Sequence, residues 1–392
     1  MNATSSRRPP SHPAAEADWT LPVYAQLDLE PASGAGAWLA TTDGRRILDF
    51  YGGHAVAALG YGHPRLVAAL AAQARTLHFQ TNLLPLAVRA RACEALVRFA
   101  PAGLARAFLV NSGAEANENA LRLALAATGR DRVVAVEGAF HGRTAAAAAV
   151  TWRSEPWYGF PRRPFDVTFV ARGDAAAMAA AVGADVAAVI VEPVQGVAGA
   201  VDLPREFLAA ARGATSRHGA LLIFDEVQCG MGRSGQPFAA DHYGIAPDLL
   251  TTAKGLAGGF PAGALLTTDA LARDLKPGDL GTTFGGGPLA CAAIETVIAV
   301  IRAEGLLARV RELSTLIRSR CRCGPVQDVQ GLGFLLGLVC SRPAKAVQTE
   351  LLECGILAGT SADPRVLRLL PPLTLEAAHV ELLGDALAGL AP

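Results

Sequence analysis

Seven short apolar runs, rich in Val, Ile and Leu, recur between residues 106 and 268 without polar alternation. Such runs are typical of strands buried on both faces of a parallel sheet. Segments with helical periodicity separate several of them, as in residues 205–218. The pattern predicts an α/β fold with a mostly parallel, seven-stranded sheet. The predicted strands are Arg106–Asn111, Arg132–Gly138, Phe165–Val170, Ala187–Pro193, Ala220–Glu226, Asp248–Lys254 and Ala262–Thr268.

The flanking segments predict a smaller α/β lobe built from both ends of the chain. In residues 21–75, two short strands meet at Asp43-Gly44, a strong hairpin signal, and a helix opens at His63-Pro64 with Leu66, Val67, Leu70 and Ala74 on one face. We therefore expect a large domain at 76–288 and a C-terminal small domain at 289–392. The latter is predicted to contain helices at 289–303, 306–320, 344–353 and 376–390, a strand pair around 326–340, and a strand around Arg368.

The first twenty residues, rich in Pro, Ser and Ala, predict a disordered arm. Arg7-Arg8 is followed by prolines, which does not fit a secretion signal, and no uncharged apolar run approaches ~18 residues. Seven scattered cysteines without a CxxC pair indicate a reducing compartment, so we expect a cytoplasmic protein. His54, His63 and His78 share no metal-like spacing, and no metal site is predicted.

The charge balance bears on partners. Lys plus Arg and Asp plus Glu are both 35, so the formal net charge is zero. There is no global positive field to attract nucleic acid or an anionic membrane, and neither partner is expected.

Two charged residues stand at the carboxyl ends of successive apolar runs, Asp225 in one and Lys254 in the next. In an open α/β sheet, ligands bind beyond the carboxyl ends of the strands, so this carboxylate and this amine are expected to face one ligand. A lysine shielded from water can lose its proton near neutral pH and form a Schiff base. The alternative is a plain ion pair between two loops.

A turn of small residues, Ser112-Gly113-Ala114, follows the first strand and leads into a helix predicted from Ala116 to about Thr128. The free N–H groups and positive dipole end of such a helix form a seat for phosphate, although an ordinary β–α turn has the same pattern.

Other strands deliver an aromatic ring, Phe140, a guanidinium, Arg143, and a carboxylate, Glu192, to the same predicted edge. Together with the amine and the phosphate seat, these groups fit a flat, basic, phosphorylated heterocycle that carries an aldehyde. Pyridoxal phosphate has these features.

Eight stretches of the chain resemble the class III pyridoxal-phosphate aminotransferases, and among these most closely the acetylornithine/ornithine aminotransferases. Any one stretch is a weak signal, but they occur in order over nearly the whole chain beyond the arm. The resemblance implies a fold-type-I transferase with a large and a small domain, and a homodimer with shared active sites. The stretches are YGGHAVAALGYGHP (51–64), NSGAEANENALRLA (111–124), FHGRT (140–144), EPVQG (192–196), DEVQCGMGRSG (225–235), TTAKGLAGGFPAGA (251–264), GTTFGG (281–286) and VLRLLPPL (366–373).

The resemblance implies a role for each cofactor-binding residue. Lys254 would carry the cofactor as a Schiff base and then move the substrate proton, while Asp225 would pair with the pyridine nitrogen. Phe140 and Val227 would contact the two ring faces, and Gln228 the phenolic oxygen. The remaining expected cofactor contacts are Ser112, Gly113, Ala114, Glu192 and, from the partner subunit, Thr283.

The resemblance implies that arginines bind the substrate carboxylates, since a guanidinium can donate two parallel hydrogen bonds to a carboxylate. The resemblance gives Arg368 the α-carboxylate of 2-oxoglutarate or glutamate, and Arg143 the carboxylate of the amino donor, with Thr282 near the donor. An Arg368 that points to solvent from an edge strand is the alternative.

The implied reaction moves the terminal amine of N-acetylornithine or a related donor to 2-oxoglutarate, which gives a semialdehyde and glutamate. Two departures matter: Val197 stands where ornithine-type members usually carry Glu, and Gly286-Gly287-Pro288 lacks the family's Asn. Val197 leaves Arg368 without a carboxylate partner and favours an apolar pocket wall. The alternatives are therefore an ω-amino acid transaminase for β-alanine or 4-aminobutyrate with pyruvate or 2-oxoglutarate, a decarboxylase or aminomutase, and a cofactor-binding protein without turnover.

Overall fold

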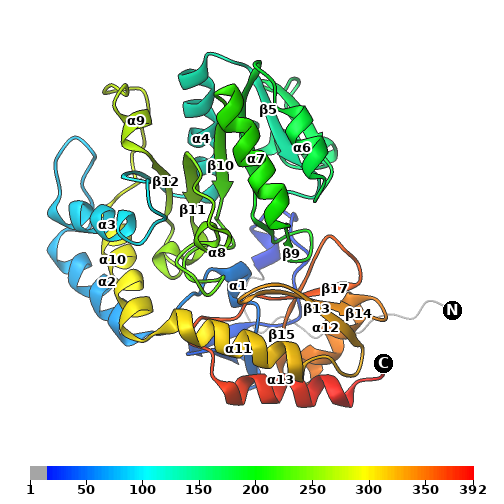
Figure 1. The fold of residues 1–392 in the computed structure, drawn as a ribbon. Coiled ribbons are helices and arrows are strands. Elements are labelled where there is room, and N and C mark those ends of the chain that lie inside the picture. Colours follow the sequence, from blue (N-terminus) through cyan, green and yellow to red (C-terminus); the bar gives the residue numbers. More distant parts are fainter. Residues whose placement is uncertain (1–15) are drawn as a thin grey trace.

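The structure, a computed structural model, describes residues 16–392. The predicted disordered arm at 1–20 therefore lies mostly outside the described residues. In Figure 1 a large sheet with its helices forms the upper half of the molecule, and smaller sheets with α11, α12 and α13 form the lower half. Short helix α1 (Gly52–Ala55) lies between them.

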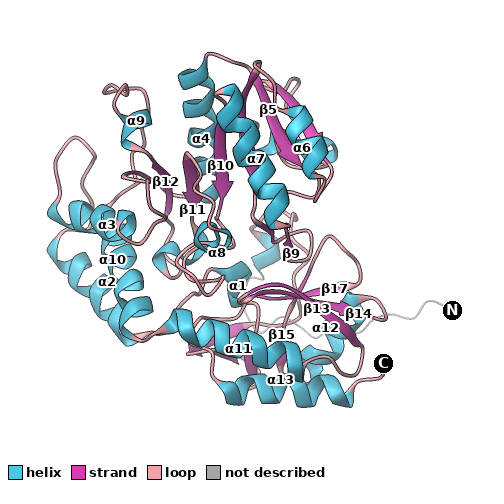
Figure 2. Ribbon diagram, viewed as in Figure 1, coloured by secondary structure: helices cyan, strands magenta, loops and turns pink. Residues whose placement is uncertain are grey.

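The seven predicted strands form one seven-stranded sheet. Its order is β4-β12-β11-β10-β7-β5-β6, and only β12 runs antiparallel to its neighbours. The prediction of a mostly parallel sheet is confirmed, and the strands appear as the magenta arrows in the upper half of Figure 2. Their bounds are β4 (Arg106–Val110), β5 (Arg132–Val136), β6 (Asp166–Val170), β7 (Val186–Val191), β10 (Leu221–Asp225), β11 (Leu249–Thr252) and β12 (Gly263–Thr267).

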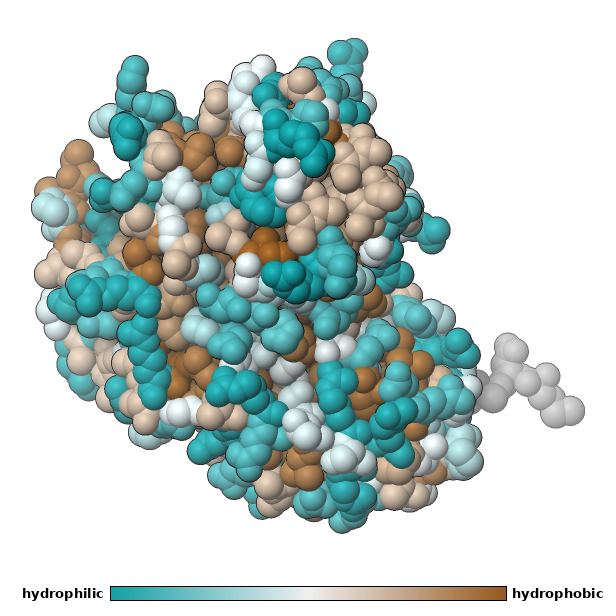
Figure 3. All heavy atoms as spheres, in the orientation of Figure 1, coloured by the Kyte–Doolittle hydropathy of each residue, from teal (hydrophilic) through white to brown (hydrophobic). Residues whose placement is uncertain are grey.

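Helices cover both faces of this sheet, and the side chains of successive strand residues pack alternately against the helices of one face and those of the other. Val133 and Ala135 of β5 pack with α4 (Gly113–Thr128) and α5 (Ala145–Ala149), whereas Val134 and Val136 pack with α6 (Ala175–Ala181) and α7 (Arg205–His218). Because side chains alternate between the faces of a strand, a strand apolar at every position is buried on both. The alanine-rich α6 gives the pale brown area at the upper right of Figure 3.

The lower half contains two four-stranded sheets. One has the order β13-β14-β17-β16, and the other, β1-β2-β3-β15, joins the two ends of the chain because Ile356 pairs with Leu48 and Leu357 with Asp49. The strands are β1 (Pro31–Ala35), β2 (Trp38–Thr41), β3 (Arg46–Asp49), β13 (Val326–Leu332), β14 (Leu335–Cys340), β15 (Ile356–Leu357), β16 (Gly359–Thr360) and β17 (Val366–Leu369), with helices α11 (Leu306–Arg320), α12 (Ala344–Glu353) and α13 (Ala377–Gly389).

Three further helices pack together at the left of Figure 1. These are α2 (Pro64–Thr76), α3 (Ala87–Val97) and α10 (Pro288–Ala303). The hydrophobic stripe predicted for α2 is partly wrong, since Leu66 is buried but Val67 is 54% exposed. The remaining elements are η1 (Glu16–Asp18), η2 (Glu155–Trp157), β8 (Val194–Gln195), β9 (Val201–Asp202), α8 (Ala239–Tyr243), η3 (Lys254–Ala257) and α9 (Asp269–Ala272).

The expected domain boundaries, after residues 75 and 288, stay predictions. Across residues 16–392, no helix is long and apolar enough to cross a membrane.

Candidate active site

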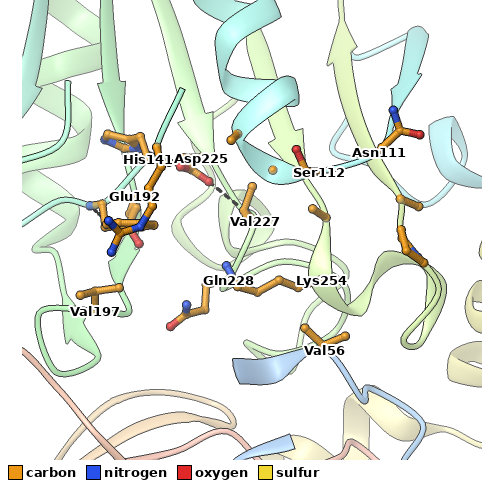
Figure 4. A pocket seen from close by; sticks show the side chains of 18 of the residues that line it. Val56, Asn111, Ser112, His141, Glu192, Val197, Asp225, Val227, Gln228 and Lys254 are labelled. Atoms are coloured by element: carbon orange, nitrogen blue, oxygen red, sulfur yellow. Dashed lines mark hydrogen bonds and ion pairs between the residues drawn. The ribbon is translucent and has the colours of Figure 1, made fainter. Parts of the chain in front are cut away.

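A cleft of about 510 Å³ opens at the carboxyl-terminal edge of the large sheet (Figure 4). Strands β4, β7, β10 and β11 all end at this edge, and β12, which runs the opposite way, begins there. Ten of the thirteen predicted site residues line the cleft: Ser112, Gly113, Ala114, Phe140, Arg143, Glu192, Asp225, Val227, Gln228 and Lys254.

Asp225 is the last residue of β10 and is 3% exposed. Its Oδ1 accepts a hydrogen bond from Val227 N at 3.0 Å. Its Oδ2 accepts one from Asn117 Nδ2 at 2.7 Å and lies 2.7 Å from His141 Nδ1. Three partners thus hold this buried carboxylate in one orientation, as a buried charge requires. Among the described residues, the ion pair recorded for Asp225 is with His141, so the plain Asp225–Lys254 ion pair is not observed.

Asn117 and His141 contact Asp225, although no motif in the sequence marks either of them for this role. Asn117 lies on the inner face of α4, where its Oδ1 accepts a hydrogen bond from Thr251 at 2.6 Å and its Nδ2 also donates to His141 O. The one sequence signal was an Asn inside an otherwise alanine- and leucine-rich helix stripe. His141 Nε2 is buried without a hydrogen-bond partner within residues 16–392.

Lys254 begins the 3₁₀ turn η3, two residues after β11 ends. Its φ of 48° is in the left-handed region, which costs a residue with a side chain about 1–2 kcal/mol. Removal from water lowers the pKa of the Lys254 amine, and the Arg368 charge adds to this effect, whereas Asp225 and Glu192 oppose it. The lysine is therefore closer to a neutral, nucleophilic amine than a surface lysine.

Glu192, directly after β7, joins two loops of the cleft. Its Oε1 accepts a hydrogen bond from Phe140 N at 2.8 Å, and its Oε2 accepts one from Gly196 N at 3.2 Å. Burial, followed by the negative charge of Asp225, raises the pKa of Glu192 to about 7. The carboxyl thus fixes the backbone beneath Phe140 and can change its charge near neutral pH.

The amino end of α4 faces the cleft. The helix is longer than predicted, because it starts at Gly113 and not at Ala116. Ser112 caps it by accepting a hydrogen bond from Glu115 N at 3.1 Å, and its carbonyl accepts one from Ala116 N. The N–H groups of Gly113 and Ala114 have no acceptor within a helix that begins there. They form an anion seat at the positive end of a four-turn helix.

Glycine is required at two points of this seat. A Cβ at Gly113 would lie 2.6 Å from Val227 Cγ1, and one at Gly142 would lie 2.8 Å from the Cβ of Ala114. The helix start can therefore approach the strand ends this closely only without a side chain at these positions.

The two predicted arginines differ in setting. Arg143 is exposed at the cleft, and its guanidinium lies 4.6 Å from the ring centroid of Trp157. Arg368 does not line the cleft directly but lies behind Gln228, with Nη1 3.5 Å from Gln228 Oε1. It is 5% exposed on β17, an inner strand of its sheet, which rules out the solvent-facing edge-strand alternative.

Thr282 and Thr283 lie outside the cleft lining of the same chain. Thr282 Oγ1 accepts a hydrogen bond from Gly285 N at 3.1 Å, and Thr283 is exposed. A role for Thr283 in the partner's site, as the resemblance implies, stays a prediction.

Comparisons with known proteins agree with this geometry. The Aminotransferase class-III family profile matches residues 23–390. The chain is 44% identical to the acetylornithine aminotransferase of Mycolicibacterium smegmatis over 93% of this chain and 94% of the relative, and 44% identical to that of Streptomyces coelicolor over 94% and 92%. An ornithine aminotransferase structure from Toxoplasma gondii, with pyridoxal phosphate at partial occupancy in its active site, superposes with a TM-score of 0.89 at 29% identity, covering 95% of this chain and 91% of that one. The chain therefore belongs to the class-III aminotransferases and is a transaminase with the fold of that family.

Proposed function

We propose that the cleft binds pyridoxal 5'-phosphate and that the chain transfers the terminal amine of an ornithine-like donor to 2-oxoglutarate. The observation that carries the proposal is the convergence of a desolvated lysine, a buried carboxylate held by His141 and Asn117, and a helix amino end on one cleft. A basic ring, an aldehyde and a phosphate match these three features.

Each residue of the cleft has a separate proposed role. Asp225 would hold a proton on a ring nitrogen, since three donors keep its carboxylate fixed. Gly113 and Ala114 would bind the phosphate, with Ser112 beside them, and Phe140 and Val227 would enclose the ring with Gln228 at its edge. When bound, pyridoxal phosphate supplies an aldehyde that takes up amines and a ring that accepts electrons from the substrate carbon. Lys254 would hold the cofactor and then carry a proton to or from that carbon.

The donor follows from the relatives and from the two arginines. The relatives named above are acetylornithine aminotransferases, so we propose N-acetylornithine or a similar acylated ornithine as donor and a semialdehyde and glutamate as products. Arg143, at the cleft surface, would bind the donor carboxylate, and the buried Arg368 the α-carboxylate of the oxo acid. Thr282 lies outside the cleft lining, but its Oγ1 is 3.5 Å from Nδ2 of the lining residue Asn111, and we propose that it lies near the donor.

A homodimer is part of the proposal. Phe284, next to Thr283, is 66% exposed and contacts Phe79 in a tilted arrangement, with ring centroids 5.4 Å apart. Two exposed phenylalanines that meet from neighbouring loops form an apolar surface, which favours contact with another subunit. A second copy placed there would bring Thr283 to the other site. Consistent with the thiols recorded as free in residues 16–392, we propose a reducing, cytoplasmic location.

A panel of donors tests the proposal. The purified holoenzyme is assayed with N-acetylornithine, ornithine, β-alanine and 4-aminobutyrate, each with 2-oxoglutarate and with pyruvate. We expect the highest kcat/KM for N-acetylornithine with 2-oxoglutarate. Val197 gives the cleft an apolar wall, which favours the ω-amino acid alternative. That alternative predicts a higher kcat/KM for β-alanine or 4-aminobutyrate than for N-acetylornithine, and this result would replace our substrate assignment.

A further inference from the structure

Residues 52–55 form one turn of left-handed helix beside the cleft. The φ angles of Gly52, Gly53, His54 and Ala55 are 54°, 56°, 63° and 69°. Left-handed backbone is unfavourable for residues with a side chain, and consecutive left-handed residues are rare. Val56, which follows directly, lines the cleft (Figure 4). Backbone strain of this kind persists only where surrounding contacts enforce it, and it gathers at functional sites.

The contacts that enforce the turn come from a buried carboxylate and a buried guanidinium. Asp49 Oδ1 accepts hydrogen bonds from the backbone N–H groups of Tyr51 at 2.6 Å and Gly52 at 2.9 Å. Arg233 donates to the carbonyl of Ala55 at 3.4 Å. A Cβ on Gly52 would lie 2.6 Å from Leu370 O, so glycine is required there for space as well as conformation.

The turn brings Tyr51 and His54 together, three residues apart. The Tyr51 hydroxyl lies 2.8 Å from His54 Nδ1, and their ring centroids are 4.6 Å apart. The same hydroxyl accepts a hydrogen bond from Arg368 Nη2 at 2.9 Å. Because arginine only donates, the single hydroxyl proton is directed to His54 Nδ1, which places the proton of neutral His54 on Nε2.

Arg368 is otherwise held by neutral acceptors. Nε donates to Thr360 O at 2.8 Å, and Nη1 donates to Gly196 O at 3.3 Å and to Gln228 Oε1 at 3.5 Å. No carboxylate within residues 16–392 forms an ion pair with it. Tyr51 is therefore the contact that fixes the Nη2 end of the guanidinium.

The strand beside Arg368 is shaped for the tyrosine ring. A Cβ on Gly359 would lie 1.8 Å from Tyr51 Cε2, so any other residue would displace the ring. Gly359 pairs with Arg368 across β16 and β17, and its neighbour Thr360 accepts the Nε bond. With Gly196 and Gln228, four segments of the chain thus contact one guanidinium.

We propose that Tyr51 and His54 are positioning residues that orient Arg368 toward the carboxylate of the oxo acid, and that His54 tunes the binding of that anion. The proposal rests on the assignment of Arg368 to the oxo acid made above. Tyr51 fixes one end of the guanidinium, and His54 sets which way the tyrosine proton points. A protonated His54 donates to Tyr51, which frees the hydroxyl proton for the bound carboxylate.

The charges around His54 give this arrangement a pH dependence. Tyr51, Arg368 and Lys254 are the titratable groups that interact with it. Burial, and then the positive charges of Arg368 and Lys254, lower the pKa of His54 below its ordinary value. A carboxylate bound at Arg368 offsets the first charge and so favours proton uptake by His54. The KM for the oxo acid should therefore fall as the pH is lowered.

Separate half-reactions, followed by visible absorbance, test the proposal. The amino donor alone is added to the holoenzyme in its aldehyde form, and the oxo acid alone is added to enzyme whose cofactor the donor has first converted to the amine form and from which the donor has been removed. Loss of a hydrogen bond to a charged group lowers affinity by about tenfold or more. Tyr51→Phe, which keeps the ring, should raise the apparent dissociation constant for 2-oxoglutarate about tenfold and change that for the donor less than about twofold. An unchanged constant for the oxo acid, or equal losses for both substrates, would overturn the proposal.

The second variant is His54→Gln, with His242→Gln on the exposed part of α8 as its control. Between pH 6 and 8, wild type and His242→Gln should show a KM for 2-oxoglutarate that rises with pH, and His54→Gln a flatter profile. If KM depended on pH in the same way in wild type, His54→Gln and His242→Gln, the proposed role of His54 would be wrong. Absence of any transamination by wild type would instead defeat the proposed function, whereas an active wild type with an unaffected Tyr51→Phe defeats only this inference.

Discussion

Lys254 and Asp225 face the same cleft but are controlled by different neighbours. Desolvation moves the lysine toward the neutral amine, whereas three hydrogen-bond donors hold the aspartate in place. The amine thus loses its proton more readily than a surface lysine, and the carboxylate is ready to pair with a cation.

Replacing Lys254 with Ala should remove the proton carrier. A positioned acid–base group contributes about 10²–10⁴-fold, so we expect kcat to fall by at least about 10³-fold. Turnover is measured with N-acetylornithine and 2-oxoglutarate, and a circular dichroism spectrum like that of wild type serves as the folding control. Retained turnover would mean that another group moves the proton.

Asn117→Ala should destabilise the fold, because it leaves the buried Asp225 short of one donor. A broken hydrogen bond to a buried charge costs about 2 kcal/mol. Urea unfolding of the cofactor-free protein measures this cost. Asn119→Ala, two residues along the same helix, loses only a bond to Glu115 O and is the matched control. Equal losses in both variants would show that the effect belongs to the helix and not to Asp225.

Most of the residues that line the cleft were predictable from the sequence, whereas the residues that hold Asp225 in place were not. Asp225 and Lys254 stand where strands end, a position that apolar runs mark. Asn117 and His141 meet Asp225 across 108 and 84 residues of sequence. No local pattern specifies which side chains meet at such separations, so the carboxylate's partners appear only in the folded chain.

At the scale of elements, buried strands were the easiest to predict and short turns the hardest. All seven strands of the large sheet have a continuous apolar run, with charged residues only at strand ends, and α7 has the predicted bounds of Arg205–His218. The left-handed turn at Gly52–Ala55 has no periodicity. It is held by Asp49, which lies just before it, and by Arg233, which is 178 residues from Ala55 in the sequence. Its sequence, GGHA, shows only that two residues tolerate positive φ.

The junction of α4 with the cleft gives a prediction at this scale. Gly113→Ala would place a Cβ 2.6 Å from Val227 Cγ1 and push the helix start away from its seat. We expect the affinity for pyridoxal phosphate to fall about tenfold through weakened anion contacts. Fluorescence titration of the cofactor-free protein measures it.

Gly129→Ala is the control for that variant. This residue ends the same helix at φ 67°, and a Cβ there would meet nothing within 4 Å. It should lower stability by about 1 kcal/mol and leave the cofactor affinity unchanged. Similar affinities for both variants would contradict a phosphate seat at Gly113.

At the scale of the whole molecule, buried carboxyls link folding to pH. Glu226 is fully buried and accepts hydrogen bonds from Ala239 N and Ala240 N at the start of α8. Burial raises its pKa from 4.5 to about 8. The folded chain therefore keeps a proton that the unfolded chain has released, and stability is lost as the pH rises through about 8.

Glu226→Gln should remove this part of the pH dependence. Between pH 6.5 and 8.5 the wild type should lose about 2 kcal/mol more of its unfolding free energy than the variant. Urea titrations of the cofactor-free protein at the two pH values give this difference. Glu206→Gln, at an exposed position on α7, should behave as wild type. If Glu226→Gln keeps the wild-type slope, Glu226 does not hold the proton.

The pairing of β15 with β3 has a consequence for biosynthesis. Residues 46–49 leave the ribosome early, but their partner strand at 356–357 follows about 300 residues later, roughly 15 to 60 seconds at 5–20 residues per second. During that interval the edge of β3 is bare, and an open strand edge invites pairing with other chains. A nascent chain that stalls before residue 356 thus exposes a strand edge that the finished chain covers, and we expect it to aggregate more readily than the finished chain.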